Sequence, residues 1–150
     1  RQDKYYVPLI INDRLDICLA VDAAGVHLGQ TDLPCSEARR ILGAEKIIGV
    51  SAATPEEAAK AQSDGADYLG VGAVFATSTK TNTRPVTAET IRAIRSAVDI
   101  PFVVIGGVNS ENISGLHGLG INGAAVISAI ISQPDITAAA RKMRQAAERL

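Results

Sequence analysis

Two aspartates stand at positions in this sequence where they could hold a metal ion. Asp13 follows an aliphatic run at residues 7–11, and Asp32 comes shortly after a second run at residues 26–28. Carboxylate oxygens are hard ligands that suit Mg²⁺. The pattern therefore favours a magnesium site shared by Asp13 and Asp32. A single aspartate after a strand is, however, more often a helix cap.

Groups that suit phosphate follow the later aliphatic runs. The segment TSTK at residues 77–80 offers hydroxyl donors and the cation of Lys80 to phosphate oxygens. Gly106 and Gly107 follow a run at residues 102–105, and Ser128 follows a run at residues 124–127, as in the phosphate sites of barrels. A polar loop and a glycine turn are the ordinary interpretations of such segments. Their occurrence after one run after another favours a functional site.

The elements that must position these groups repeat one pattern, in which a short aliphatic run precedes a longer amphipathic segment. The runs occupy residues 7–11, 26–28, 47–50, 68–71, 102–105 and 124–127. Nearly every residue in them is apolar, which is typical of parallel strands that are buried on both faces. His27 interrupts one run, and we expect it to be a packed, hydrogen-bonded residue and not a catalyst.

The segments between the runs carry helix signals. Thr54 and Glu57 form a capping box, and Pro55 occupies the first helical position. Ile91 and Ile94 share one helical face. Glycine in the left-handed conformation ends helices without a steric penalty, and we expect this role at four positions. These positions are Gly25, Gly43, Gly65 and Gly120.

Strands that alternate with helices leave two architectures open, a doubly wound sheet and a closed barrel. The segment GVGAVF at residues 70–75 begins like a dinucleotide-binding loop, but Phe75 stands where the third glycine belongs. The nucleotide-binding interpretation is therefore weak. In both architectures the chemistry lies at the carboxyl ends of the strands.

Composition restricts the classes of partner. The 150 residues suit a single domain, 1–150, and the net charge of −1 gives no field that would attract nucleic acid or an anionic membrane. No apolar run reaches the roughly 20 residues that cross a bilayer. Cys18 and Cys35 are expected to be structural thiols in a reducing compartment. We expect a cytoplasmic protein with small-molecule partners, and homo-oligomer formation stays open.

The sequence resembles the thiamine phosphate synthase family in segments that together cover essentially the whole chain beyond Tyr6. These read VPLIIND at residues 7–13, GVHLGQTD at 25–32, IGVS at 48–51, GADYLGVG at 65–72, TSTK at 77–80, IGG at 105–107 and VISAI at 126–130. The resemblance implies a TIM (β/α)₈ barrel and a magnesium-dependent transferase of thiamine biosynthesis. Such an enzyme condenses 4-amino-5-hydroxymethyl-2-methylpyrimidine diphosphate with 4-methyl-5-(2-hydroxyethyl)thiazole phosphate. The products are thiamine phosphate and pyrophosphate.

The resemblance also implies residue roles. Asp13 and Asp32 would hold Mg²⁺, and Asn12 would contact the diphosphate or the metal's ligand shell. Ser51 and Lys80 would bind pyrophosphate and serve as the catalytic groups. The thiazole phosphate would contact the residues that follow three other runs, namely Thr77, Thr79, Gly107, Ile127 and Ser128. The implied reaction is dissociative, with pyrophosphate leaving before the thiazole nitrogen attacks, so no protein nucleophile is required.

The chain departs from the family pattern in places. Ala76 replaces the proline that usually precedes the TxTK loop. Six strand–helix units are present where a barrel needs eight. We therefore expect an N-terminally incomplete barrel that lacks its first one to two units, with residues 1–4 as a remnant of a pyrophosphate-binding segment.

Two alternative functions stay open for such a chain. One is a thiazole tautomerase-like isomerase, which would need a phosphate pocket but no carboxylates for a metal–diphosphate complex. The presence of Asp13, Asp32 and Lys80 argues against it. The other is a non-catalytic relative that binds thiazole phosphate or thiamine phosphate.

Overall fold

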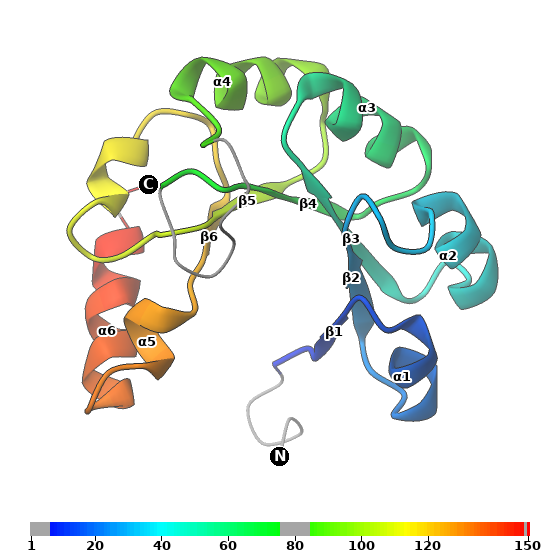
Figure 1. The fold of residues 1–150 in the computed structure, drawn as a ribbon, viewed down its shortest axis with the longest axis horizontal. Helices are drawn as coiled ribbons and strands as arrows, with labels where there is room; N and C mark the ends of the chain where they lie inside the picture. The colour runs from blue at the N-terminus through cyan, green and yellow to red at the C-terminus, as the bar shows by residue number, and fades with distance from the viewer. Residues whose placement is uncertain (1–6, 76–84, 149) are drawn as a thin grey trace.

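A computed structural model describes residues 7–75, 85–148 and 150 of the chain, and Figure 1 shows their arrangement. Six strands form one sheet in the order in which they occur in the sequence, and every neighbouring pair is parallel. The strands are β1 (Ile10–Asn12), β2 (Gly25–Leu28), β3 (Ile47–Ala52), β4 (Tyr68–Gly72), β5 (Phe102–Ile105) and β6 (Gly123–Ala125). A doubly wound sheet would reverse its strand order, so the sequential order supports the barrel-like alternative.

The helices lie along the outer side of the curved sheet (Figure 1). They are α1 (Leu15–Ala20), α2 (Cys35–Leu42), α3 (Pro55–Ser63), α4 (Ala88–Ala97), the 3₁₀ helix η2 (Ile113–Leu116), α5 (Ser128–Ile131) and α6 (Ile136–Ala147). The described residues thus form a six-stranded parallel half-barrel whose edge strands are β1 and β6. No helix in the described part of the chain is long and apolar enough to span a membrane.

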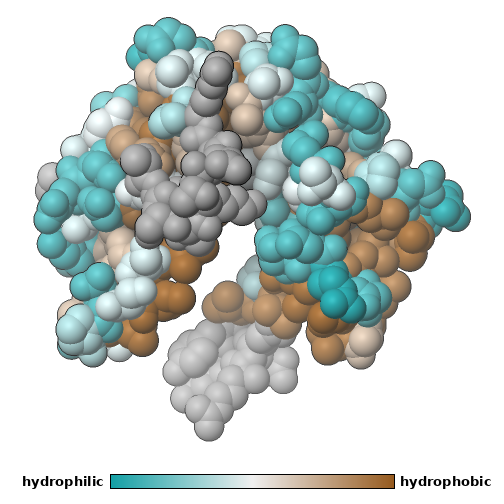
Figure 2. Space-filling view, in the orientation of Figure 1, coloured by the Kyte–Doolittle hydropathy of each residue, from teal (hydrophilic) through white to brown (hydrophobic). Residues whose placement is uncertain are grey.

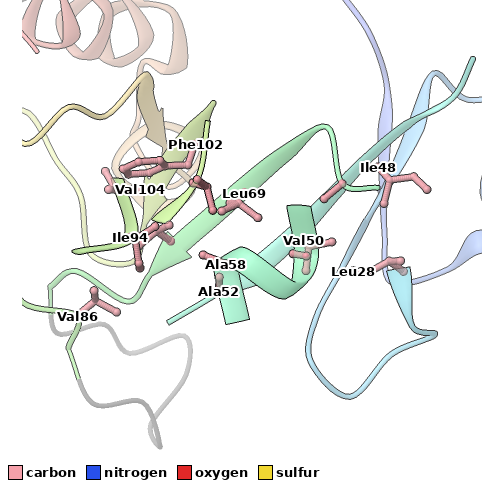
Figure 3. Packing of buried hydrophobic residues seen from close by; sticks show 14 of the residues in the cluster. Leu28, Ile48, Val50, Ala52, Ala58, Leu69, Val86, Ile94, Phe102 and Val104 are labelled. Atoms are coloured by element: carbon pink, nitrogen blue, oxygen red, sulfur yellow. The ribbon is translucent and has the colours of Figure 1, made fainter. Parts of the chain in front are cut away.

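The hydrophobic core lies between the sheet and these outer helices. Leu28, Val50, Leu69 and Phe102 are aligned side by side across four strands, and none is more than 6% exposed. Helices α3 and α4 pack against this face of the sheet with Ala58 and Ile94, among others (Figure 3). Burial of this apolar row, at roughly 25 cal/mol per Å² of apolar area, stabilises the packing of the helices on the sheet.

The inner face of the sheet differs from the expectation of strands that are apolar on both faces. Successive side chains of a strand point to opposite faces, so the residues between the core positions face away from the helices. Asn12, His27, Gly49 and Tyr68 are aligned across β1 to β4 on that inner face. The runs looked uniformly apolar because several of their inner positions are glycine, which provides space instead of hydrophobic surface.

Local signals in the sequence are mostly confirmed. The Thr54 hydroxyl accepts a hydrogen bond from the Glu57 N–H at 3.2 Å, and the Glu57 carboxylate accepts one from Ala53 N–H at 2.7 Å. Three glycines have the expected left-handed backbone, with φ of 73° at Gly43, 94° at Gly65 and 71° at Gly120.

The expectation for Gly25 is wrong, because this residue lies inside β2 and not in a helix cap. A Cβ atom at Gly25 would stand 2.1 Å from the carbonyl oxygen of Ile47 on the next strand. Glycine is therefore required there for a close approach between strands. The sequence alone does not distinguish this reason for a glycine from a turn.

Candidate functional site

Asp13 and Asp32 both lie at the side of the sheet where the carboxyl ends of the parallel strands meet, which we call the rim. Asp13 directly follows β1 with a left-handed φ of 64°, and its N–H donates to the carbonyl oxygen of His27 on β2 at 2.8 Å. Asp32 follows β2 by four residues, and its Oδ2 accepts a hydrogen bond from Gly29 N–H at 2.7 Å. Each aspartate is thereby held by the end of β2 or the loop that follows it.

The helix-cap interpretation of these aspartates does not hold. The residue that precedes α1 is Arg14, the residue that precedes α2 is Pro34, and neither helix has a side-chain cap. The carboxylates of Asp13 and Asp32 are therefore not used as N-caps of these helices.

The oxygen ligands offered here suit a magnesium ion that takes only part of its coordination from the protein. In the described part of the chain, no three His, Cys, Asp or Glu side chains gather as a metal site. Mg²⁺ commonly takes only one or two protein carboxylates and completes its octahedron with water and substrate phosphates. The carboxylates of Asp13 and Asp32 are of the type and number that such an ion takes, and Asn12, an exposed amide at the end of β1, directly precedes Asp13 in the sequence.

Ser51 near the end of β3 is fixed through both its side chain and its main chain. Its hydroxyl lies 3.0 Å from Nε2 of His27, and its carbonyl accepts a hydrogen bond from the Gln30 amide at 2.6 Å. His27 is confirmed as a packed, hydrogen-bonded residue, with its Nδ1 3.0 Å from the hydroxyl of Tyr68. Sequence reasoning missed the contributions of Gln30 and Tyr68, because their partners are set by strand pairing across 21 and 41 residues.

Gly107 lies in a sharp turn directly after β5. Gly106 and Gly107 both have left-handed φ values, 97° and 65°, and the Asn112 side chain donates to the carbonyl oxygen of Gly107 at 2.8 Å. Only glycine adopts two such conformations in succession at little steric cost. The turn keeps side-chain atoms away from the backbone at this point of the rim.

Ile127 and Ser128 mark the end of the rim at β6. Ser128 is exposed and begins the short helix α5, and Ile127 precedes it as the N-cap residue. The first N–H groups of a helix have no partner within the helix, so they are available to an anion. Gly107 and Ser128 follow the neighbouring strands β5 and β6 and therefore lie on the same edge.

The remaining predicted site residues lie outside the described residues. Thr77, Thr79 and Lys80 belong to the segment 76–84, so the structure tests neither their contacts nor their proposed roles. The described candidates come from β1, β2, β3, β5 and β6 and all follow or end these strands. Parallel strands bring their carboxyl ends to one edge, which places the candidates on a common rim.

Burial affects the titratable groups near the sheet. Tyr68 is half-buried, and burial raises its pKa above the ordinary 10.0. Burial also raises the pKa of the Cys18 and Cys35 thiols. Both cysteines are free and buried, as expected for structural thiols.

The fold and the rim together define the class of the protein: a parallel α/β enzyme fold of the TIM-barrel type. The chain matches the family model described as thiamine monophosphate synthase over residues 2–130. It is 58% identical over 141 residues to the thiamine-phosphate synthase of Ruminiclostridium cellulolyticum, which covers 94% of this chain and 67% of that protein. It is 51% identical over 147 residues to the enzyme of Clostridium botulinum, which covers 98% of this chain and 69% of that protein. The chain belongs to the thiamine monophosphate synthase family.

Solved structures agree with this assignment. The thiamine phosphate pyrophosphorylase of Pyrococcus furiosus superposes with a TM-score of 0.89 at 40% identity, over 98% of this chain and 70% of that chain. A 3-hexulose-6-phosphate synthase, with a TM-score of 0.65 at 21% identity, shares the fold alone. The predicted family and the prediction of an enzyme are confirmed. The relatives give no support to the isomerase or to the non-catalytic alternative.

Proposed function

We propose that the protein condenses the pyrimidine diphosphate with the thiazole phosphate to form thiamine phosphate and pyrophosphate. The observation that carries this proposal is the 58% identity to a thiamine-phosphate synthase across 94% of the chain. The arrangement of the rim supports it, because acidic, hydroxyl and glycine residues follow successive strands on one edge of the sheet.

The pyrophosphate half of the site is assigned to the first three strands. Asp13 and Asp32 hold Mg²⁺, and Asn12 contacts the diphosphate or the metal's ligand shell. Bound Mg²⁺ supplies positive charge against the departing pyrophosphate. The Ser51 hydroxyl donates to a phosphate oxygen, and Lys80 adds a second positive charge. These groups stabilise charge that develops as the carbon–oxygen bond breaks, so no protein nucleophile is required.

The thiazole phosphate half is assigned to the last strands. The turn at Gly107 and the start of α5 at Ile127 and Ser128 present backbone N–H groups, and Thr77 and Thr79 add hydroxyl donors. Holding both substrates on one rim brings the thiazole nitrogen close to the cationic pyrimidine carbon, which converts an encounter in solution into a step within one complex.

The six strands are proposed to be part of an eight-stranded barrel that forms a single domain, of which residues 1–150 are the N-terminally incomplete portion. Hydrophobic surface gathers at both ends of the arc of strands (Figure 2). Val7, Leu19 and Val21 are 48–60% exposed beside β1, and Ile127 and Ile131 are 53% and 64% exposed after β6. Two further strand–helix units between β6 and β1 would cover these residues and pair both edge strands. We place this domain in the cytoplasm, with small molecules as partners.

An assay of pyrophosphate release with each substrate omitted in turn tests the proposed function. A synthase releases pyrophosphate only when both the pyrimidine diphosphate and the thiazole phosphate are present, and it forms thiamine phosphate in equal amount. Release of pyrophosphate without the thiazole phosphate, or conversion of a thiazole phosphate alone, would contradict the proposal.

A further inference from the structure

Three side chains from neighbouring strands form a continuous hydrogen-bonded chain on the inner face of the sheet. The Tyr68 hydroxyl on β4 lies 3.0 Å from His27 Nδ1 on β2, and His27 Nε2 lies 3.0 Å from the Ser51 hydroxyl on β3. The two rings are tilted by 41° with centroids 5.4 Å apart. Both imidazole nitrogens are thus committed to hydroxyl partners, which fixes the plane of the ring.

Two glycines provide the space that this chain occupies. Gly49 stands between His27 and Tyr68 in the strand register, and a Cβ atom there would lie 2.2 Å from Cζ of Tyr68. A Cβ atom at Gly70 would lie 2.9 Å from Cε1 of His27. Contacts this short are incompatible with the observed ring positions, so both glycines are needed for this arrangement of the three polar side chains.

The direction of the hydrogen bonds decides what Ser51 does. In one pattern, the Tyr68 O–H donates to Nδ1 and the Nε2–H donates to the Ser51 oxygen, which leaves the Ser51 proton available. In the reverse pattern, Nδ1–H donates to Tyr68 and the Ser51 O–H donates to Nε2. A neutral imidazole has one donor and one acceptor nitrogen, so these are the two consistent patterns.

Only the first pattern lets Ser51 donate a hydrogen bond to an anion. In that pattern Tyr68 acts as the first donor, which a phenol is able to do because it keeps its proton at neutral pH. The Gln30 amide holds the Ser51 carbonyl at 2.6 Å and so fixes the backbone from which the hydroxyl projects.

We propose that His27 and Tyr68 are positioning residues that hold the Ser51 hydroxyl with its proton directed at the pyrophosphate. His27 acts as the Nε2–H tautomer, and the Tyr68 O–H selects that tautomer by donating to Nδ1. This inference rests on the proposed pyrophosphate-binding role of Ser51. It gives a role to His27 and Tyr68, which have none in the proposed function.

Paired substitutions at His27 separate positioning from simple packing. The amide nitrogen of glutamine lies near the place of Nε2, so His27→Gln keeps a donor for Ser51. The shorter His27→Asn places its amide near Nδ1, where it meets Tyr68 but does not reach Ser51. The measurement is the binding of inorganic pyrophosphate in the presence of Mg²⁺ by calorimetry, with circular dichroism as the check on folding.

We expect His27→Asn and Ser51→Ala each to weaken pyrophosphate binding roughly 10- to 100-fold, because each removes one well-directed hydrogen bond to a charged group. We expect His27→Gln to bind pyrophosphate within about threefold of the unsubstituted protein, because the glutamine amide keeps the hydrogen bond to Ser51. Equal loss in His27→Gln and His27→Asn, or no loss in His27→Asn, would overturn the proposal.

The tautomer of His27 is also directly observable in the unsubstituted protein, with two variants used for assignment and comparison. Two-bond ¹H–¹⁵N correlation spectra distinguish a protonated from a bare ring nitrogen, and the signal absent from His27→Gln identifies His27. The proposal requires a proton on Nε2 and a bare Nδ1 in the folded protein, with a shift towards the other tautomer in Tyr68→Phe. A proton on Nδ1 in the unsubstituted protein would overturn it.

Ser51→Ala and His27→Asn together distinguish the pyrophosphate-binding role of Ser51 from the positioning role of His27. If Ser51→Ala binds pyrophosphate as well as the unsubstituted protein, the proposed role of Ser51 is wrong and the positioning role falls with it. If Ser51→Ala binds weakly while His27→Asn binds normally, the pyrophosphate site stands and only the positioning role is wrong.

Discussion

Asp13 and Asp32 resemble each other in the sequence but reach the rim in different ways. Asp13 depends on an uncommon left-handed backbone, which aspartate tolerates better than most residues. Asp32 closes its own turn by accepting the Gly29 N–H with one carboxylate oxygen. A carboxylate has about four lone-pair positions, so this bond leaves most of its capacity for a metal.

Replacing either carboxylate by its amide should separate chemistry from folding. We predict that Asp13→Asn and Asp32→Asn each keep the fold but lower turnover on the order of 10²–10³-fold, the loss typical of one missing electrostatic contact to a departing anion. Binding of the thiazole phosphate alone should barely change, because the pocket proposed for it uses other strands. Steady-state pyrophosphate release and calorimetry measure the two effects.

Asp22 offers a matched control for these variants. It is another aspartate with a left-handed backbone, φ 50°, but it precedes β2 at the opposite edge of the sheet. Asp22→Asn should leave turnover unchanged. Equal loss of turnover in Asp22→Asn and Asp13→Asn would show that a general effect of removing a carboxylate, and not the metal, explains the result.

The raised pKa of Tyr68 has a defined consequence for stability in alkali. The unfolded chain releases the phenol proton near pH 10.0, while burial makes the folded state hold it to higher pH. The contribution is therefore fully present below pH 10.0 and is lost as pH rises through the raised pKa of the folded state. We predict that the free energy of unfolding, measured in urea, falls less steeply above pH 10.0 in Tyr68→Phe. Parallel curves for the two proteins would contradict this.

At the scale of elements, the features predicted best from the sequence were those that depend on contacts between residues close together in the chain. The capping box at Thr54 and the helix-ending glycines Gly43 and Gly65 were predictable because their partners lie within one turn of helix. The close approach of Gly25 to Ile47 was not predictable, since it depends on which strand lies beside β2.

The turn after β5 provides a test at this scale. We predict that Gly107→Val lowers the affinity for thiazole phosphate at least about tenfold, which corresponds to about 1.4 kcal/mol, because a side chain at a left-handed position displaces the backbone that meets the phosphate. Isothermal titration calorimetry measures this affinity.

Gly118 is the control for that substitution. It has a similar left-handed φ of 72°, and a Cβ atom there meets no atom within 4 Å. It lies before β6, at the edge opposite to the rim. Gly118→Val should cost stability in the same way but leave thiazole phosphate affinity unchanged. An equal loss of affinity in both variants would place the phosphate elsewhere.

At the scale of the whole molecule, the candidate site belongs to no single element. Asn12, Asp32, Ser51, Gly107 and Ser128 come from or follow five different strands, and only the parallel, sequential sheet puts them on one edge. The strand ends could be predicted from the sequence because polar residues follow each aliphatic run. The hydrogen-bonded chain through His27 could not, because it depends on strand register and on two inner glycines that looked like ordinary apolar positions.

The central claim is that the carboxylates of the rim act with Mg²⁺ on a departing pyrophosphate. Its most direct test is the rate of pyrophosphate release by the protein with both substrates, measured with Mg²⁺, after removal of divalent ions by EDTA, and after Mg²⁺ is restored. We predict that release stops in EDTA and returns with Mg²⁺, because the charge that develops on a leaving pyrophosphate must be neutralised. Undiminished release in EDTA would contradict the account.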